Sequence, residues 1–191
     1  MSRPESHPTR LRGYFAIGAE RISKPFNLGN LMRSAHAFGA SFFFTVDAHH
    51  TVSGGAVRRA HSDTSNAPDH MPLFQWSSAE AMRLPHGCQL VGVELLDDAV
   101  DLPSFRHPSQ AAYVFGAERG SLSSEVLERC DHVVKIPTAF CINIAMAGAI
   151  VMYDRVRSLG RFPAPPVMPG GDVEPIEVHV HGEAFSRSGD A

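Results

Sequence analysis

The sequence predicts an α/β fold with a mostly parallel sheet and helices on both faces. Short apolar segments alternate with segments whose apolar residues recur every three or four positions, which is typical of strands alternating with helices. The apolar segments are nearly continuous, as expected for strands covered on both faces. With 191 residues, 43% of them hydrophobic, the chain is long enough for one ordinary domain with a core.

The amino-terminal half predicts two strands around a helix. Residues 13–20 (GYFAIGAE) and 41–48 (SFFFTVDA) are the strands. Between them, apolar residues recur at helical spacing from Asn27 to about Phe38, and Gly39 ends the helix. Asn27 suits a helix N-cap. Arg33 stands among apolar neighbours, so its guanidinium looks buried.

The middle of the chain is less regular. Residues 49–72 are rich in Ser, His, Gly and Asp, which predicts a long surface loop with a short helical piece. Residues 73–78 (LFQWSS) predict a short strand, and residues 78–84 (SAEAMRL) predict a helix.

Three more strands and two helices are predicted beyond this point. The strands are residues 88–96, 111–118 and 132–137, and the helices are 123–130 and 142–160. Ser123 is a plausible N-cap with Glu125 in the first turn, and Gly160 ends the last helix. Ligands of parallel sheets bind at the carboxyl ends of strands, so the candidate loops follow Ala19, Asp47, Leu95, Phe115 and Ile136.

Domain organisation follows from composition. We expect a flexible arm at residues 1–12, the domain at residues 13–161, and a Pro- and Gly-rich tail at residues 162–191 with a candidate strand at 176–180. No apolar run approaches the length of a membrane helix, and no secretory signal opens the chain. Three cysteines without metal spacing favour a reduced, cytoplasmic protein.

The charge and the histidines limit the function further. A formal net charge of -3 argues against indiscriminate nucleic-acid binding, so any RNA contact needs a local patch. Arg58 and Arg59 favour such a patch, whereas the arginines of residues 154–161 suit either RNA or a solvated face. The histidines at 49–50 and 179–181 lack partners at ligand spacing, so no metal site is predicted.

Three separated segments stand out at the junctions of strands, loops and helices. They are residues 27–35 (NLGNLMRSA), 115–122 (FGAERGSL) and 136–154 (IPTAFCINIAMAGAIVMYD). No GxGxxG, GxxxxGK[ST], GxSxG or HExxH is present, which weakens a reading as a generic nucleotide-binding enzyme.

In this order, the three segments resemble the signature motifs of the SpoU/TrmH family, a branch of the SPOUT superfamily of RNA 2′-O-ribose methyltransferases. The resemblance covers roughly residues 13–160. It implies a carboxyl-terminal deep trefoil knot, S-adenosylmethionine as the cofactor and a homodimer that completes the site. It assigns catalytic roles to Asn27, Arg33, Glu118 and Asn143, and it assigns cofactor contacts to Val93, Gly116, Ile136 and Ile142.

The residue types suit methyl transfer to a ribose 2′-hydroxyl, a poor nucleophile that must lose a proton. Alignment of the reactants can supply about 7–11 kcal/mol of the barrier. The resemblance makes Arg33 the base, primed by a substrate phosphate. Guanidinium is very rarely neutral, so a second reading is a phosphate clamp that stabilises the developing alkoxide.

One substitution affects the substrate prediction. Cys141 stands where the family usually has a serine, and the stretch before Asn143 is shorter than usual. The chain resembles the compact members of the family, and this resemblance implies tRNA rather than rRNA as the substrate. The alternative is a non-catalytic RNA-binding module that retains the fold. The simplest interpretation of Cys141 is a small buried residue. The small residues between 145 and 149 suit either core packing or, as the resemblance implies, a dimer interface.

Overall fold

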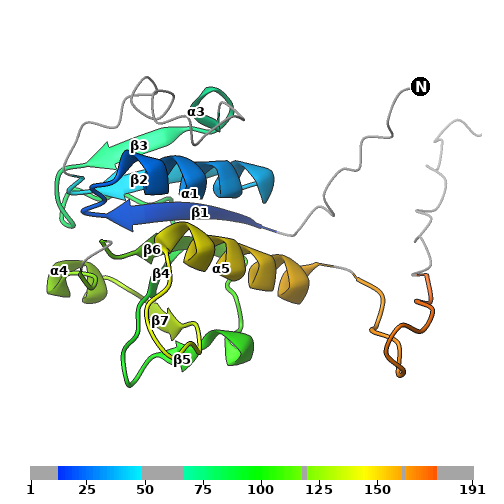
Figure 1. The fold of residues 1–191 in the computed structure, drawn as a ribbon. Helices are drawn as coiled ribbons and strands as arrows, with labels where there is room; N and C mark the ends of the chain where they lie inside the picture. Colours follow the sequence, from blue (N-terminus) through cyan, green and yellow to red (C-terminus); the bar gives the residue numbers. More distant parts are fainter. Residues whose placement is uncertain (1–12, 49–66, 118–119, 161, 176–191) are drawn as a thin grey trace, which may run out of the picture. The chain divides into compact units, whose positions relative to one another are not determined.

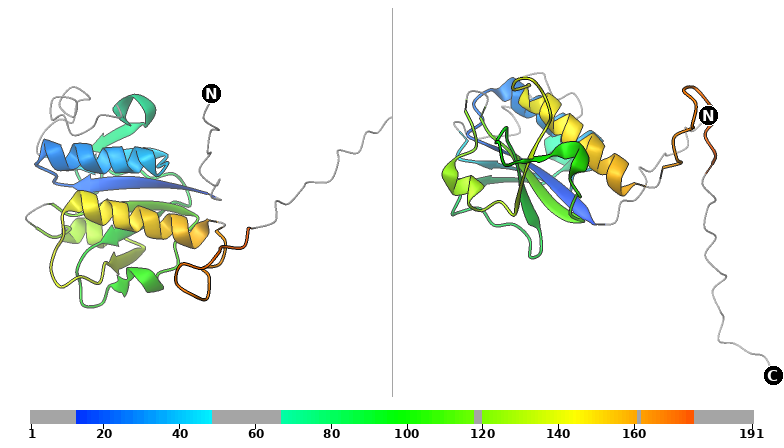
Figure 2. Two further views of the ribbon diagram at one scale, coloured as in Figure 1. Left: turned by 45° about the vertical axis from the view of Figure 1, so that its right-hand side comes forward. Right: turned by 90° about the horizontal axis from the view of Figure 1, so that it is seen from below.

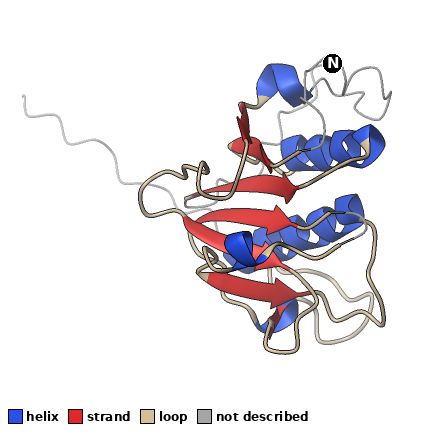
Figure 3. Ribbon diagram, turned by 90° about the vertical axis from the view of Figure 1, so that its left-hand side faces the viewer, coloured by secondary structure: helices blue, strands red, loops and turns tan. Residues whose placement is uncertain are grey.

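The computed structural model describes residues 13–48, 67–117, 120–160 and 162–175. Seven strands form one sheet in the order β3-β2-β1-β6-β4-β7-β5, and every recorded pairing is parallel. The longer strands point the same way (Figure 3), so their carboxyl ends meet at one edge. The strands are β1 (Tyr14–Glu20), β2 (Phe42–Val46), β3 (Leu73–Trp76), β4 (Gln89–Val93), β5 (Val100–Asp101), β6 (Gln110–Phe115) and β7 (His132–Lys135).

Two long helices cover one face of the sheet. Helix α1 (Pro25–Ala37) and helix α5 (Ile144–Leu159) run side by side in both views (Figures 1 and 2). They pack on Phe15, Ile17 and other residues that alternate along the strands. At Gly148, an added Cβ would lie 2.2 Å from Leu31 Cδ1. The absence of a side chain there is what lets the two helices approach so closely.

The opposite face carries no long helix among the described residues. The short helix α4 (Ser124–Leu127) and the segment 77–88 cover it, through Val126, Ala79 and Met82. The predicted helix at 78–84 was wrong, because this segment forms turns. Pro85 disfavours helical geometry in the residue before it, and Gly87 takes a left-handed φ of 77°, so too few residues remain for a stable helix.

Smaller differences concern the element ends. Helix α1 begins at Pro25, with Lys24 as its N-cap, so Asn27 lies inside the helix and the predicted N-cap was wrong. Proline presets the backbone for a first helical position, which explains the earlier start. The sequence reading also missed β5 and the single 3-10 turn η1 (Leu102–Ser104). The short helix α3 (Ala67–His70) lies in the predicted loop region.

The chain divides into two compact units, residues 1–160 and 161–191. The described part of the second unit, residues 162–175, contains neither helix nor strand. The predicted arm at 1–12 and the candidate strand at 176–180 lie outside the described residues. No described helix is both long and apolar enough to cross a membrane.

Candidate functional site

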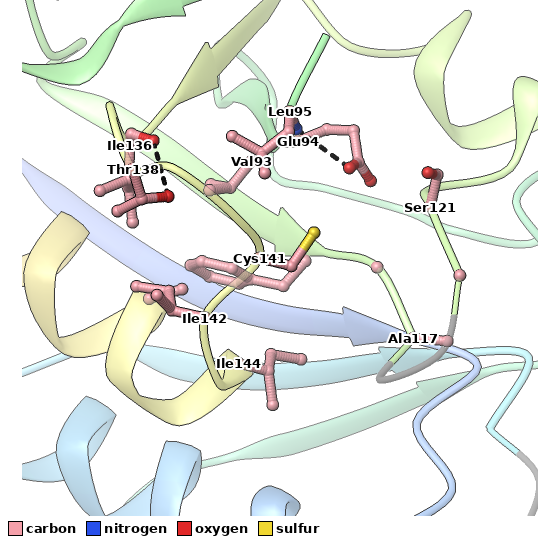
Figure 4. Close-up of a pocket in the computed structure, with 14 residues that line it drawn as sticks. Val93, Glu94, Leu95, Ala117, Ser121, Ile136, Thr138, Cys141, Ile142 and Ile144 are labelled. Carbon is pink, nitrogen blue, oxygen red and sulfur yellow. Dashed lines mark hydrogen bonds between the residues drawn. The ribbon is translucent and has the colours of Figure 1, made fainter.

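A pocket of about 350 Å³ opens at the carboxyl ends of β4, β6 and β7 (Figure 4). Three of the five candidate loops, those after Leu95, Phe115 and Ile136, therefore meet in one place. The first turn of α5 forms a further wall of the pocket, through Ile144 and Ala147. The lining residues are Val93, Glu94, Leu95, Phe115, Gly116, Ala117, Gly120, Ser121, Ile136, Thr138, Cys141, Ile142, Ile144 and Ala147.

All four residues predicted to contact a cofactor line this pocket. Val93, Ile136 and Ile142 contribute apolar side chains, and Gly116 contributes backbone. An added Cβ at Gly116 would lie 2.8 Å from the Leu122 nitrogen and 3.0 Å from the Ser121 carbonyl carbon. Glycine is therefore needed here so that the loop after β6 can fold back against the end of its own strand.

Glu94 is a pocket residue that the sequence reading missed. It follows the last residue of β4, and its carboxylate accepts hydrogen bonds from two backbone N–H groups. Leu95 donates to Oε1 at 3.0 Å, and Leu122 donates to Oε2 at 2.8 Å. Glu94 thus joins two walls of the pocket. An acidic residue directly after a buried strand was the signal that could have found it.

The predicted asparagines of the first and third motifs meet. Asn143 Nδ2 donates to Asn27 Oδ1 at 3.0 Å, which links α5 to α1. Asn143 is also the N-cap of α5, since its Oδ1 accepts from the Ala145 N–H at 2.9 Å. Asn27 is buried, whereas Asn143 is exposed. The pair therefore fixes the start of both long helices beside the pocket.

Arg33 is exposed on α1, so the expectation of a buried guanidinium was wrong. Its sequence neighbours Leu31, Met32 and Ala35 are buried, but Arg33 projects from another side of the helix. Arg33 does not line the pocket of its own chain. The predicted site residue Glu118 and the predicted RNA contacts Arg58 and Arg59 lie outside the described residues.

Arg155 has neither of the roles considered for the arginines of 154–161. It is only 1% exposed, so it belongs neither to an RNA patch nor to a solvated face. Its guanidinium donates to the carbonyls of Tyr14 and Ser109 at 3.2 and 2.9 Å and to the Tyr113 hydroxyl at 3.2 Å. It lies at the amino ends of β1 and β6, away from the edge that carries the pocket.

The three cysteines are free thiols, and Cys141 is exposed at the rim of the pocket. This is a correction to its reading as a buried small residue. Burial raises the pKa of the Cys130 thiol to about 11. Within the described ranges, no cluster of three His, Cys, Asp or Glu side chains could hold a metal ion. Both histidine pairs noted in the sequence fall outside these ranges.

The sequence profile of the SpoU rRNA Methylase family matches residues 14–153. This range includes the first two motifs, all but the last residue of the third, and every described pocket residue. The chain belongs to the SpoU rRNA methylase family. Its parallel sheet with flanking helices matches the SpoU fold, as solved structures of this family show. The resemblance read from the three motifs is thereby confirmed.

Three proteins illustrate the similarity. A mouse protein named tRNA (guanosine(18)-2′-O)-methyltransferase TARBP1 is 27% identical over 149 residues, which is 74% of this chain and 9% of that protein. A Thermus thermophilus tRNA (guanosine(18)-2′-O)-methyltransferase is 26% identical and covers 72% of each chain. The crystal structure of the SpoU methyltransferase AviRb from Streptomyces viridochromogenes in complex with AdoMet has a TM-score of 0.66 at 26% identity and covers 81% of this chain and 61% of AviRb.

Proposed function

We propose that this chain transfers a methyl group from S-adenosylmethionine to the 2′-hydroxyl of a ribose in RNA, and that the RNA is a tRNA. The observation that carries the proposal is the pocket at the ends of β4, β6 and β7 in a chain of the SpoU family. The preference for tRNA is supported by the names of the mouse and Thermus relatives.

The pocket suits S-adenosylmethionine in size and chemistry. Its volume of about 350 Å³ lies within the range of small-molecule sites. Val93, Ile136 and Ile142 can enclose an apolar ring, and the Glu94 carboxylate has the charge opposite to that of a sulfonium. When bound, S-adenosylmethionine supplies a methyl group on a positively charged sulfur, so the displacement itself needs no metal.

The chain's own residues have to position and deprotonate the ribose hydroxyl. Arg33, held on a rigid helix and exposed, can bind a phosphate with its planar fork and stabilise the developing alkoxide. The reading of Arg33 as the base remains open beside this one. The hydrogen-bonded pair of Asn27 and Asn143 fixes the start of α1 relative to the pocket. The family resemblance also assigns a catalytic role to Glu118, which lies outside the described residues.

We also propose a homodimer, a carboxyl-terminal trefoil knot and a cytoplasmic location. An exposed apolar stripe on α5 (Met146, Ile150 and Tyr153) supports the dimer. The exposed position of Arg33 supports it too, because a second copy could bring Arg33 to a pocket. The knot is supported by the family resemblance, and the location is supported by the three free thiols.

The activity test is methylation of unmodified tRNA and rRNA transcripts with labelled S-adenosylmethionine, followed by mass spectrometry of the nucleosides. A 2′-O-methylated nucleoside in tRNA is expected. Product in rRNA alone would contradict the substrate, and a methylated base would contradict the chemistry. If calorimetry detects no binding of S-adenosylmethionine, the chain is better explained as a non-catalytic RNA-binding module.

Arg33→Ala should reduce kcat/KM by at least about 100-fold, since removing one charge-stabilising donor typically has an effect of this size. Arg33→Lys keeps the charge without the planar fork, so a similar loss would show that bidentate geometry is required. Exposed Arg106 is the matched control, and Arg106→Ala should keep full activity. Wild-type activity in Arg33→Ala would exclude both roles of this residue.

Asn143 can be tested separately as a helix cap and as a site residue. Asn143→Asp keeps an oxygen to cap α5 but cannot donate to Asn27, whereas Asn143→Ala loses both bonds. We expect the alanine variant to lose about 1 kcal/mol of stability and the aspartate variant much less. Both should lose methyl transfer. An active Asn143→Asp would show that donation from residue 143 to Asn27 is dispensable.

A further inference from the structure

One wall of the pocket is the loop after β6, and it is held by side chains from both neighbouring strands. In the sheet, β6 lies between β1 and β4, and Phe115 pairs with Ala19 on one side and Val93 on the other. One position further along, Gly116 is therefore flanked by Glu20 and Glu94. These two carboxylates accept the N–H groups of consecutive loop residues, Ser123 and Leu122, each at 2.8 Å.

Arg21 adds a third bond to this loop. Its Nη2 donates to the Ser121 carbonyl at 2.8 Å, and Ser121 itself lines the pocket. The Nε atom of Arg21 lies 3.7 Å from Glu20 Oε1. Residues 121, 122 and 123 thus each have one main-chain group bound by a side chain at the carboxyl end of β1 or β4. Arg21 has 37% of its side chain accessible, whereas Glu20 is buried with 4% accessible.

The backbone of Arg21 is unusual. Its φ of 48° lies in the left-handed region, which an arginine adopts only at a cost and which glycine or asparagine would adopt more readily. Backbone strain of this kind often occurs at functional sites. The conformation turns the chain out of β1, where the Arg21 N–H donates to the Val46 carbonyl at 2.8 Å, and directs the guanidinium to the loop.

We infer that Arg21 is a positioning residue that fixes the Gly120–Ser121 wall of the cofactor pocket to the segment leading into α1. The loop has little room to shift, because its backbone already packs against Gly116. Arg21 therefore couples the pocket to the segment that carries Asn27 and Arg33. This inference rests on the proposed function, since it assigns the pocket to a cofactor.

The test compares Arg21→Ala, Arg21→Gly and Arg21→Lys with Arg106→Ala, a change of an exposed arginine on the η1–β6 connection. Two principal quantities are measured in the 191-residue chain. One is the hydrogen–deuterium exchange of the Leu122 and Ser123 amides without ligand, and the other is the Kd for S-adenosylmethionine. Arg21→Gly is the decisive variant, because it removes the guanidinium and relieves the backbone strain, so its melting temperature should not fall.

Arg21→Ala and Arg21→Gly should exchange the two amides faster and weaken cofactor binding about tenfold, the effect of one hydrogen bond from a charged group. KM for the cofactor should rise more than kcat falls, and Arg21→Lys should restore part of the affinity. A purely structural role would instead lower the melting temperature and leave Kd unchanged.

Wild-type exchange and wild-type Kd in Arg21→Gly would overturn the inference. If the wild-type protein does not bind S-adenosylmethionine, the proposed function fails. The exchange of the two amides then still decides whether Arg21 positions the loop.

Discussion

At the scale of single residues, a largely buried chain of hydrogen bonds passes through His107 and ends at Asp154. Asp154 can only accept, so His107 Nε2 donates to it at 3.0 Å and His107 Nδ1 accepts from the Tyr113 hydroxyl at 2.6 Å. The Tyr113 oxygen in turn accepts from Arg155 Nη1. Burial raises the pKa of Tyr113 to about 12, which keeps its proton in place. The network is therefore complete only while His107 is neutral.

Stability should consequently fall in mild acid. Burial lowers the pKa of His107 below its ordinary value of 6.5, against the opposing effect of Asp154. The unfolded state then binds the proton more tightly, so the free energy of unfolding falls as the pH drops through about 6.5 towards the folded-state pKa. Urea unfolding between about pH 7.5 and about pH 5.5 measures this slope. His107→Gln should show a flatter slope, and an unchanged slope would exclude His107 as its source.

At the scale of elements, α1 and α5 meet at Gly148. The Cβ of an alanine there would lie 2.2 Å from Leu31 Cδ1, and Leu31 is fully buried. Alanine is the better helix former by about 1 kcal/mol, but overpacking costs about 1–3 kcal/mol. We therefore expect Gly148→Ala to be neutral to destabilising and Gly148→Val to be clearly destabilising in denaturant unfolding.

Leu31→Ala supplies the control for this contact. Leu31→Ala removes the atom with which an added side chain at position 148 would collide. In the Leu31→Ala background, Gly148→Ala should therefore lower the free energy of unfolding less, or even raise it. The difference between the two backgrounds isolates the contact. If the effects of Gly148→Ala and Leu31→Ala on the free energy of unfolding were strictly additive, helix packing would not be the reason for a glycine at position 148.

The elements also show what the sequence could and could not predict. Two of the strands that end at the pocket, β4 and β6, were predictable because they are buried on both faces and form apolar runs in the sequence. The helix prediction for residues 78–84 failed. Their composition is typical of a helix, but Pro85 and Gly87 leave too few residues for one to form. Motif resemblance located Val93, Gly116, Ile136 and Ile142. The first three lie at or directly after the ends of recognisable strands, and Ile142 lies just before the last helix.

Tertiary partners decide the remaining cases. Arg155 is buried only because carbonyls from two strand ends and the Phe15 ring, 5.4 Å from its guanidinium carbon, surround it. Arg33 is exposed only because α1 turns its other side to the sheet. Glu94 gains its role from Leu122, 28 residues away. None of these contacts is local, so periodicity and charge patterns alone do not reveal them.

At the scale of the whole molecule, the proposed dimer has a specific candidate surface. Met146, Ile150 and Tyr153 recur every three or four residues along α5, and Met146 and Tyr153 are 61% and 62% exposed. Phe26 is exposed on α1, the helix that packs beside α5. A monomer rarely exposes a large continuous apolar patch to water, and a stable interface buries about 1,200–2,000 Å² of total accessible surface.

The double change Met146→Glu and Ile150→Glu should therefore convert the protein to a monomer, as measured by analytical ultracentrifugation. The fold should be retained, because both side chains already face solvent in one chain.

Val100→Glu is the matched control. Val100 is also an exposed apolar residue, but it lies on β5 at the edge of the sheet, so its variant should remain dimeric. If the site requires two copies, the monomer should lose methyl transfer while Val100→Glu keeps it. A wild-type protein that sediments as a monomer would contradict the dimer, and a fully active monomeric variant would show that one chain contains the whole site.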